Sequence, residues 1–310
     1  MSRNRPSPYL LLVLTTFFWG ANAVVGKMLG SQVTPLTLNA LRWVVATGVL
    51  FPLAWSREGQ HLKKWRSHWP TLLAMGATGV LGFNSLVYLA VRYTTATNAT
   101  LINTAAPLII SFFSFLLGLE RPARRQVAGM LLGTCGVVWI LFRGDLHKLL
   151  ALQPNLGDAL MVAAILLWSF YSLAARKVMH YLPNLTATAV SSLLGTCMLV
   201  PVSLWEAAHA GIKLNAQVIL GAAYLGIFCS VLAFLWWNYG MASLGPGRAA
   251  AFLYLTPFFT AILSRLLLHE ALEKSQVVGG LLIIAGVYLT TSPPLRGVKV
   301  AKSGCRCTAT

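Results

Sequence analysis

Acidic side chains are scarce in this chain, which has seven Asp and Glu residues against 24 Lys and Arg residues in 310 positions. All seven carboxylates, like all six histidines, lie between apolar runs or at the ends of those runs. A metal centre or an acid–base pair needs clustered carboxylates or histidines, and a proton relay needs a carboxylate at membrane depth. We therefore predict no catalytic residue, no metal site and no cofactor, and we expect that the protein is not an enzyme.

Charge of either sign is also sparse. Charged residues make up 10% of the chain and hydrophobic residues 57%, whereas a soluble domain carries about 25% charge. This composition predicts a protein whose solvent is the lipid bilayer. The net charge of +17 does not indicate a nucleic-acid partner, because the basic residues sit in short flanks of the apolar runs and form no continuous face. The five cysteines do not have the spacing of a disulfide framework, since three of them lie inside apolar runs.

Ten apolar runs are long enough to cross a bilayer, which takes about 20 residues. They cover residues 8–29, 35–55, 70–91, 97–118, 124–142, 157–178, 185–205, 217–240, 247–268 and 275–292. Basic residues are enriched on the cytoplasmic side of membrane proteins. With the N-terminus inside, sixteen Lys and Arg residues fall on the cytoplasmic side and six on the outer side, besides Arg42 and Arg265 within spans. We therefore predict that both termini are cytoplasmic and that only the connections 56–69 and 143–156 are long.

The chain repeats itself about 150 residues apart. Residues 124–141 read RRQVAGMLLGTCGVVWIL, and residues 274–291 read KSQVVGGLLIIAGVYLTT. Because each copy holds an odd number of spans, the two copies have opposite orientations in the membrane, as in many secondary transporters. The predicted fold is an all-α polytopic membrane protein with ten transmembrane helices in two inverted five-helix repeats. The predicted units are residues 1–148, residues 149–295 and a basic cytoplasmic tail at 296–310.

Two matching polar faces lie at repeat-related positions in the fourth and ninth spans. The first contains Thr100, Asn103, Thr104, Pro107, Ser111 and Ser114, and the second contains Ala250, Leu253, Tyr254, Pro257, Thr260 and Ser264. Matching faces are what a substrate cavity on a pseudo-two-fold axis requires. Small and hydroxyl side chains also hold membrane helices together, so packing remains the alternative. Asn103 and Tyr254 are the candidate cavity residues of these faces.

Other candidate cavity residues pair aromatic rings with amides or hydroxyls. Pockets for organic solutes are mostly apolar, with a few polar groups that fix orientation. An equivalent reading for the tryptophans is plain core packing. The candidates are Trp19 and Asn22 in the first span, Asn84 and Tyr88 in the third, and Trp168 and Tyr171 in the sixth.

Two prolines, Pro107 and Pro257, recur at the repeat offset inside spans. Each removes a backbone hydrogen bond one turn back and kinks its helix. A kink of this kind is either a hinge for alternating access or a static bend. The glutamates that follow these two spans, Glu120 and Glu270, are expected to bond neighbouring backbone or arginine.

Arg42 is the most distinctive single residue, because it lies about two turns into the second span and has Ser191 as its counterpart. An arginine at mid-depth costs about 2.5–3.5 kcal/mol on insertion scales. It can bind a carboxylate or phosphate of a substrate, or it can extend to the interface or pair with helix-end carbonyls. We include Arg42 among the candidate substrate residues.

In the segments FFWGANAVVGK (17–27), LRW (41–43), YTTATNATLINTAAPLIISFFSFLLGLER (93–121) and SLGPGRAAAFLYLTPFFTAILSRLLLHEAL (243–272), the chain resembles the EamA-type transporters of the drug/metabolite transporter (DMT) superfamily. The resemblance covers nearly the whole chain. It implies ten helices in a five-plus-five inverted repeat, with a central cavity built largely from helices one, three, four, six, eight and nine. The family's substrates range from amino acids to sugars and purines, so the resemblance does not identify the substrate.

Together these features predict a secondary transporter or facilitator in a bacterial inner membrane that exports small polar metabolites such as amino acids by alternating access. Its partners are a small-molecule substrate and the lipid bilayer, with no nucleic acid; the sequence does not indicate an oligomeric state. A permease for efflux of drugs or toxic compounds is the alternative of the same class. A membrane-embedded transferase is the alternative of another class, and the scattered carboxylates argue against it.

Overall fold

A computed structural model describes residues 6–29, 32–90, 92–94, 96–145, 147, 155–210, 214–268 and 274–292. Every regular element in these ranges is helical. The predicted tail at 296–310 lies outside the described residues, as does Glu270.

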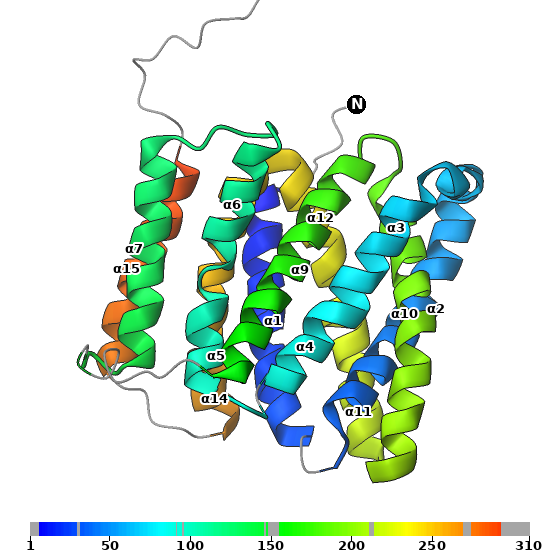
Figure 1. The fold of residues 1–310 in the computed structure, drawn as a ribbon, viewed down its shortest axis with the longest axis horizontal. Coiled ribbons are helices and arrows are strands. Elements are labelled where there is room, and N and C mark those ends of the chain that lie inside the picture. The colour runs from blue at the N-terminus through cyan, green and yellow to red at the C-terminus, as the bar shows by residue number, and fades with distance from the viewer. Residues whose placement is uncertain are drawn as a thin grey trace, which may run out of the picture.

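The first half of the chain begins with a long helix and ends with another. It contains α1 (Pro8–Leu29), α2 (Pro35–Leu62), η1 (Lys63–His68), α3 (Trp69–Met75), η2 (Gly76–Gly82), α4 (Phe83–Ala90), α5 (Ala96–Asn103), α6 (Ala106–Leu116) and α7 (Arg124–Leu141). The elements α3, η2 and α4 follow one another without a break and form one rod. The elements α5 and α6 form another. The first half therefore has five rods among the described residues (Figure 1).

The second half repeats this order. It contains α9 (Leu156–Val178), α10 (Asn184–Ala210), α11 (Ala216–Tyr224), η3 (Leu225–Leu232), α12 (Ala233–Leu244), α13 (Pro246–Ala251), η4 (Phe252–Tyr254), α14 (Leu255–Leu268) and α15 (Lys274–Thr291). The rods α11–η3–α12 and α13–η4–α14 correspond to the two segmented rods of the first half. The described residues thus agree with the ten predicted helices in two five-helix repeats.

Length and composition alone identify eight helical segments that are able to cross a membrane. One of them, Pro35–Val87, runs through α2 and the following rod together, and α7, which begins with two arginines, is not among them. The predicted connection at 56–69 is mostly helical, because α2 continues to Leu62 and η1 follows it. A kink at Glu58 (φ −133°, ψ 25°) marks the place where the long helix leaves the apolar region.

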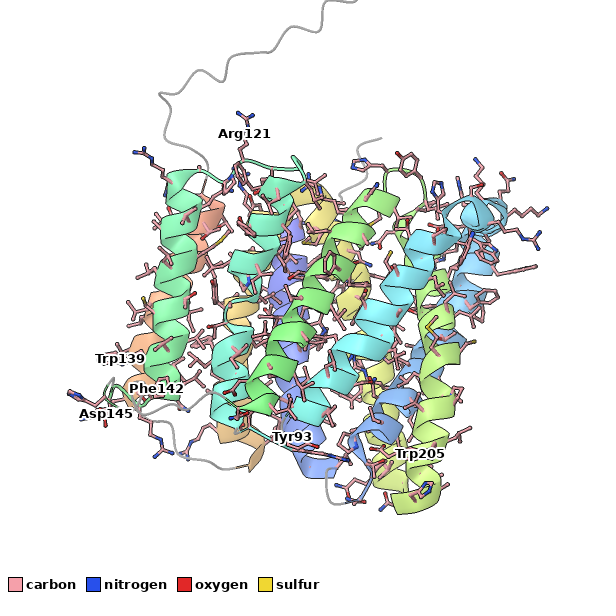
Figure 2. All side chains as sticks on the ribbon, in the orientation of Figure 1. Tyr93, Arg121, Trp139, Phe142, Asp145 and Trp205 are labelled. Atoms are coloured by element: carbon pink, nitrogen blue, oxygen red, sulfur yellow. The ribbon has the colours of Figure 1, made fainter. Side chains whose placement is uncertain are left out.

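The outside of the bundle is apolar along its length and charged at its two ends. Large apolar side chains face outward on α6, α10, α11 and α15, among them Leu116, Trp205, Leu220 and Tyr288. We call the end where α1 begins the N-terminal end; Arg121 lies there, whereas Tyr93 and Asp145 lie at the opposite end (Figure 2). This distribution is the one expected of a bundle that spans a bilayer.

Helices from the two halves exchange partners across the bundle. The helices α7 and α15 pack together at one edge, and α2 and α10 pack together at the other edge (Figure 1). Between the edges, α1 packs against α14, and α9 packs against α6. Each contact joins one half to the other, as an inverted repeat around a pseudo-two-fold axis requires.

The α7–α15 contact depends on four glycines at repeat-related positions. A Cβ atom added at Gly136 would lie 2.7 Å from the Gly279 carbonyl oxygen, and one added at Gly129 would lie 2.6 Å from the Gly286 carbonyl oxygen. The reverse contacts are equally short: a Cβ atom at Gly279 or Gly286 would lie 2.5 or 2.6 Å from the carbonyl oxygen of Gly136 or Gly129. Small residues allow helix backbones in a membrane to approach closely, and this contact has two such glycine pairs.

The α2–α10 contact is joined at both ends by carboxylates. Glu58, near the end of α2, accepts hydrogen bonds from the backbone N–H (2.9 Å) and the hydroxyl (2.7 Å) of Thr186 in the first turn of α10. Glu206, near the end of α10, accepts from the Thr37 N–H (3.2 Å) in the first turn of α2 and from the Thr34 hydroxyl (2.6 Å). Each antiparallel helix therefore caps the free N–H groups and the positive dipole end of the other.

We expect Gly136→Ala to lower the thermal stability of the protein. The new methyl group would meet the Gly279 backbone, and overpacking of this kind costs about 1–3 kcal/mol. Gly48→Ala is the matched control, because nothing lies within 4 Å of a Cβ atom added there and alanine favours a helix over glycine. The melting temperature of the detergent-purified variants measures the difference. Equal melting temperatures would contradict the close crossing of α7 and α15.

Candidate functional site

A cavity of about 590 Å³ lies between the two halves, within the size range of small-molecule sites. Its walls lie toward the end of the bundle opposite the N-terminal end. They come from the later part of α1, the early part of α2, the end of α7, the start of α9, and the helices α4, α5 and α14. Predicted residues in its lining are Trp19, Asn22, Arg42, Asn84, Asn103, Trp168 and Tyr254, together with Pro107 and Pro257. The fold thus brings most of the predicted site residues to one place.

The two prolines lie where the cavity walls change direction. Pro107 is the second residue of α6, and the helix is interrupted between Asn103 and Ala106. Pro257 follows the short 3₁₀ segment η4 at Phe252–Tyr254. Because a proline ring clashes with the carbonyl four residues earlier, both helices lose their regular bonding one turn before the proline. The side chains of Thr104 and Tyr254 lie at these interruptions.

The polar wall is formed by hydroxyls and amides. The Tyr254 hydroxyl shares a hydrogen bond with the Thr134 hydroxyl (2.9 Å), and the Thr104 hydroxyl donates to the Leu101 carbonyl (2.6 Å). Asn103 is exposed, and the Thr256 hydroxyl has no hydrogen-bond partner. The exposed Asn103 side chain is therefore available to a solute in the cavity, whereas the Thr256 hydroxyl oxygen is buried.

Aromatic rings form the floor of the cavity. The rings of Trp19 and Trp168 meet edge to face, with centroids 5.3 Å apart. Phe83 lies 5.2 Å from Trp168, and Phe234 lies 6.0 Å from Trp19. These rings give the floor an apolar surface with defined geometry.

A π-helical segment in the eighth rod positions Trp19. In η3 the Ala233 N–H donates to the Phe228 carbonyl, five residues back. The Cys229 carbonyl therefore lacks the partner that an α-helix would give it, and Trp19 Nε1 donates to that oxygen at 3.1 Å. The segment η2, at the repeat-related place in the third rod, makes the same five-residue bond from Phe83 to Thr78. Single-turn π segments often occur at functional sites.

Arg42 is the charged residue of the lining, and it neither reaches an interface nor bonds helix-end carbonyls. Its side chain is 3% exposed. Nε donates to the Ser230 hydroxyl at 2.9 Å, and Nη1 donates to Asn22 Oδ1 at 3.3 Å. The guanidinium carbon also lies 5.6 Å from the centre of the Trp43 ring. Ser230 belongs to η3, a partner that the sequence pattern did not indicate.

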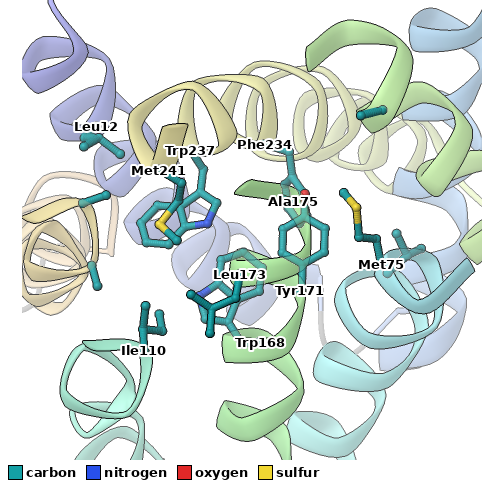
Figure 3. Close-up of a cluster of buried hydrophobic side chains, with 14 of the residues drawn as sticks. Leu12, Met75, Ile110, Trp168, Tyr171, Leu173, Ala175, Phe234, Trp237 and Met241 are labelled. Carbon is teal, nitrogen blue, oxygen red and sulfur yellow. The ribbon is translucent and has the colours of Figure 1, made fainter. Parts of the chain in front are cut away.

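The same interface is filled in the half toward the N-terminal end. Leu12, Ile110, Trp237 and Met241 are fully buried there (Figure 3). A Cβ atom added at Gly240 would lie 2.6 Å from the Leu12 side chain, so α1 and α12 are in close contact. The cavity therefore ends at the layer of Trp168 and Trp237, whose centroids are 5.6 Å apart.

Tyr171 lies in this filled half and not in the cavity lining. Its ring stacks on Trp168, and its hydroxyl donates to Asn238 Oδ1 at 3.2 Å. Asn238 Nδ2 donates in turn to the Thr188 hydroxyl at 3.0 Å. The backbone of Tyr88 belongs to α4, and its side chain lies outside the described residues.

Glu120 joins three elements at the N-terminal end. It accepts from the Gly247 N–H (3.2 Å) at the start of α13, and it lies 3.8 Å from Arg176 at the end of α9. Gly245, which precedes α13, has φ +89°, and a Cβ atom there would meet the Glu120 carboxylate at 2.7 Å. The prediction that Glu120 bonds neighbouring backbone and arginine is confirmed.

Comparisons with known proteins agree over nearly the whole chain. The profile of the family described as "EamA-like transporter family" matches residues 6–142 and again residues 155–292. A protein of Archaeoglobus fulgidus named an uncharacterized transporter is 31% identical over 92% of this chain and 97% of its own. The uncharacterized transporter YyaM of Bacillus subtilis is 26% identical over 93% of this chain and 94% of its own. A crystal structure with 23% identity shares the fold, with a TM-score of 0.78 over 93% of this chain and 97% of its own.

We expect a cysteine at Asn103 to react with a small water-soluble thiol reagent in a background that lacks the native cysteines, because that position is an exposed part of the cavity lining. A cysteine at Leu116 is the control, since that side chain is 60% exposed on the apolar outside of α6, where lipid excludes the reagent. The measurement is the labelling rate of each cysteine by mass spectrometry, which should be higher at position 103 than at position 116. Silence at both positions would show that water does not reach the cavity.

Proposed function

This chain belongs to the EamA-like transporter family, and from that premise we propose that it is a secondary transporter or facilitator for small polar metabolites such as amino acids. The observation that carries the proposal is the position of the cavity. It lies between the two inverted repeats and ends halfway through the bundle, while the other half of the same interface is closed by Trp237, Met241 and their neighbours. A site between two inverted repeats that is closed toward one end is the arrangement that alternating access uses.

The proposed motion closes the half of the interface that contains the cavity and opens the half that is filled. In the closed half, Tyr171, Asn238 and Thr188 are bonded to one another. Their repeat counterparts are Asn22, Tyr88 and Asn39, in the half that contains the cavity. Asn39 Oδ1 is buried without a hydrogen-bond partner, which is consistent with a set of groups that bond fully only when that half closes. Pro107 and Pro257 are the proposed hinges, because the helices that contain them are already interrupted there.

The proposed location is a bacterial inner membrane with both termini cytoplasmic. The basis is the excess of lysine and arginine at the N-terminal end. In this orientation the cavity lies toward the outer side and the Glu120 contacts lie at the cytoplasmic side. The units that move against each other are residues 1–148 and 149–295.

The alternatives are less well supported. A permease for cationic drugs needs a negative group at its site, and none of the described residues that line the cavity is acidic. A transferase needs clustered carboxylates or histidines near a helix end. Within the described residues, no three His, Cys, Asp or Glu side chains gather in such a group.

We expect transport in liposomes to follow the gradient of the solute and not that of protons. The described carboxylates lie at helix ends or in connections and not in the cavity, so no acidic group there is placed to change its charge as the solute binds. The measurement is solute uptake into liposomes under an imposed pH gradient and under a solute gradient. Uphill accumulation that a protonophore abolishes would contradict the expectation and direct attention to Glu120 and Glu270.

We expect Glu120→Gln to loosen the closed half. The neutral amide loses the charge-assisted bond to Gly247 and the attraction to Arg176. A cysteine at Met241, which is fully buried, should then react several-fold faster with a thiol reagent. Glu206→Gln is the control, because it removes a carboxylate at the opposite end of the bundle, where Glu206 accepts hydrogen bonds from Thr34 and Thr37 at the start of α2. Equal labelling in both variants would show that Glu120 does not hold this half closed.

A further inference from the structure

The inference starts from an unbalanced charge and rests on the proposed function. Among the described residues that line the cavity, Arg42 is the one with a charged side chain. Its partners there, Ser230 and Asn22, are both neutral. They hold the guanidinium in place, and neither compensates its charge.

The carboxylates of the described residues are committed elsewhere. Glu58 and Glu206 cap α10 and α2, and Glu120 contacts Gly247 and Arg176. Asp158 bonds Thr94 and the backbone of Asn155, and Asp145 bonds the His147 N–H. None of these groups lines the cavity, so the field of Arg42 acts on whatever enters it.

The guanidinium also has unused donors. An arginine carries five N–H groups in a planar fork, and two of them are used in the bonds to Ser230 and Asn22. Because Nε and Nη1 donate from different edges of the fork, the plane of the group is fixed, while Nη2 has no hydrogen bond within the described residues. A fixed planar donor group suits a planar carboxylate better than it suits a rounded cation or a neutral amide.

The other residues of the lining indicate which groups the ligand carries besides the one that Arg42 binds. Trp19, Trp168 and Phe234 offer aromatic surface in the same cavity as Arg42. Asn84 and Asn103 offer neutral donors and acceptors. This combination fits a small organic acid with an apolar or aromatic body and a few polar groups, and an amino acid belongs to that class.

We propose that the cavity selects solutes with a carboxylate and that Arg42 is the residue that recognises it. A dianionic phosphate would need more than one cation, and the described lining supplies one. The buried positive charge also repels cations, which separates this site from that of a cation exporter. Asn22 acts as a positioning residue, because it orients the guanidinium through Nη1 and leaves its charge unbalanced.

The test uses matched pairs of an acid and its amide: phenylacetate and phenylacetamide, isovalerate and isovaleramide, phenylalanine and phenylalaninamide. Phenyl phosphate, choline and glucose complete the panel. Thermal stabilisation of the purified full chain and counterflow in liposomes are measured for each compound. We expect the acids to raise the melting temperature and to support counterflow, and the amides to be at least ten-fold weaker.

Two variants connect the result to Arg42. Arg42→Gln should abolish the preference for acids over amides, and Arg42→Lys should keep part of it. Asn22→Asp changes one atom type and places a carboxylate at the 3.3 Å contact with Nη1, so it should weaken acid binding at least ten-fold without loss of fold. Arg57→Gln removes the same charge from an exposed position later in α2 and should leave the preference unchanged.

Several results would overturn the inference. Equal binding of acids and amides would do so, as would retention of the preference in Asn22→Asp, a stronger response to phenyl phosphate than to the acids, or no response to any acid. Counterflow of choline or glucose alone would overturn the carboxylate inference while supporting transport. Absence of counterflow for the whole panel, together with an unreactive cysteine at Asn103, would instead contradict the proposed function.

Discussion

In a bilayer a polar group has only other protein groups or a water-filled cavity as partners, and this constraint organises the whole molecule. The carboxylates Glu58, Glu120 and Glu206 lie at helix ends, where they bond free N–H groups of other helices. The exterior between the two ends carries apolar side chains. Arg42 is buried between the two ends, and its hydrogen-bond partners come from two other rods.

Because of the inverted repeat, the interface between the two repeats has two related but unequal halves. Each principal contact joins rods of opposite halves, and the glycines of α7 and α15 meet in pairs that exchange under the repeat. The symmetry places π-helical turns in both η2 and η3. One half of the interface nevertheless contains a cavity and the other an aromatic core. The two halves of the interface are therefore packed differently, and this asymmetry is the basis of the proposed rocking motion.

The helices were predictable because apolar length, proline position and basic flanks are local signals, and the predicted limits of the first span agree with those of α1. The repeat followed from spacing, and most of the candidate cavity residues followed from polar and aromatic side chains at repeat-related positions. Other features depended on contacts between rods that no local pattern encodes. Ser230 became a partner of Arg42 because a π turn rotates it toward α2, and Tyr171, which shares a face with Trp168, is withdrawn from the cavity by its bond to Asn238. Whether the lining residues bind a solute remains a prediction.

The exchange of partners between halves has a consequence for how the protein is made. The glycine face of α7 is complete when Leu141 has been synthesised, but α15 begins only at Lys274, about 130 residues later. At 5–20 residues per second, α7 waits roughly 7–26 s in the membrane for its partner. The carboxylate end of α2 waits in the same way for α10. Insertion of the first five helices therefore produces an intermediate with unmatched packing surfaces at both edges, and assembly is completed only when the last helix leaves the translocation machinery.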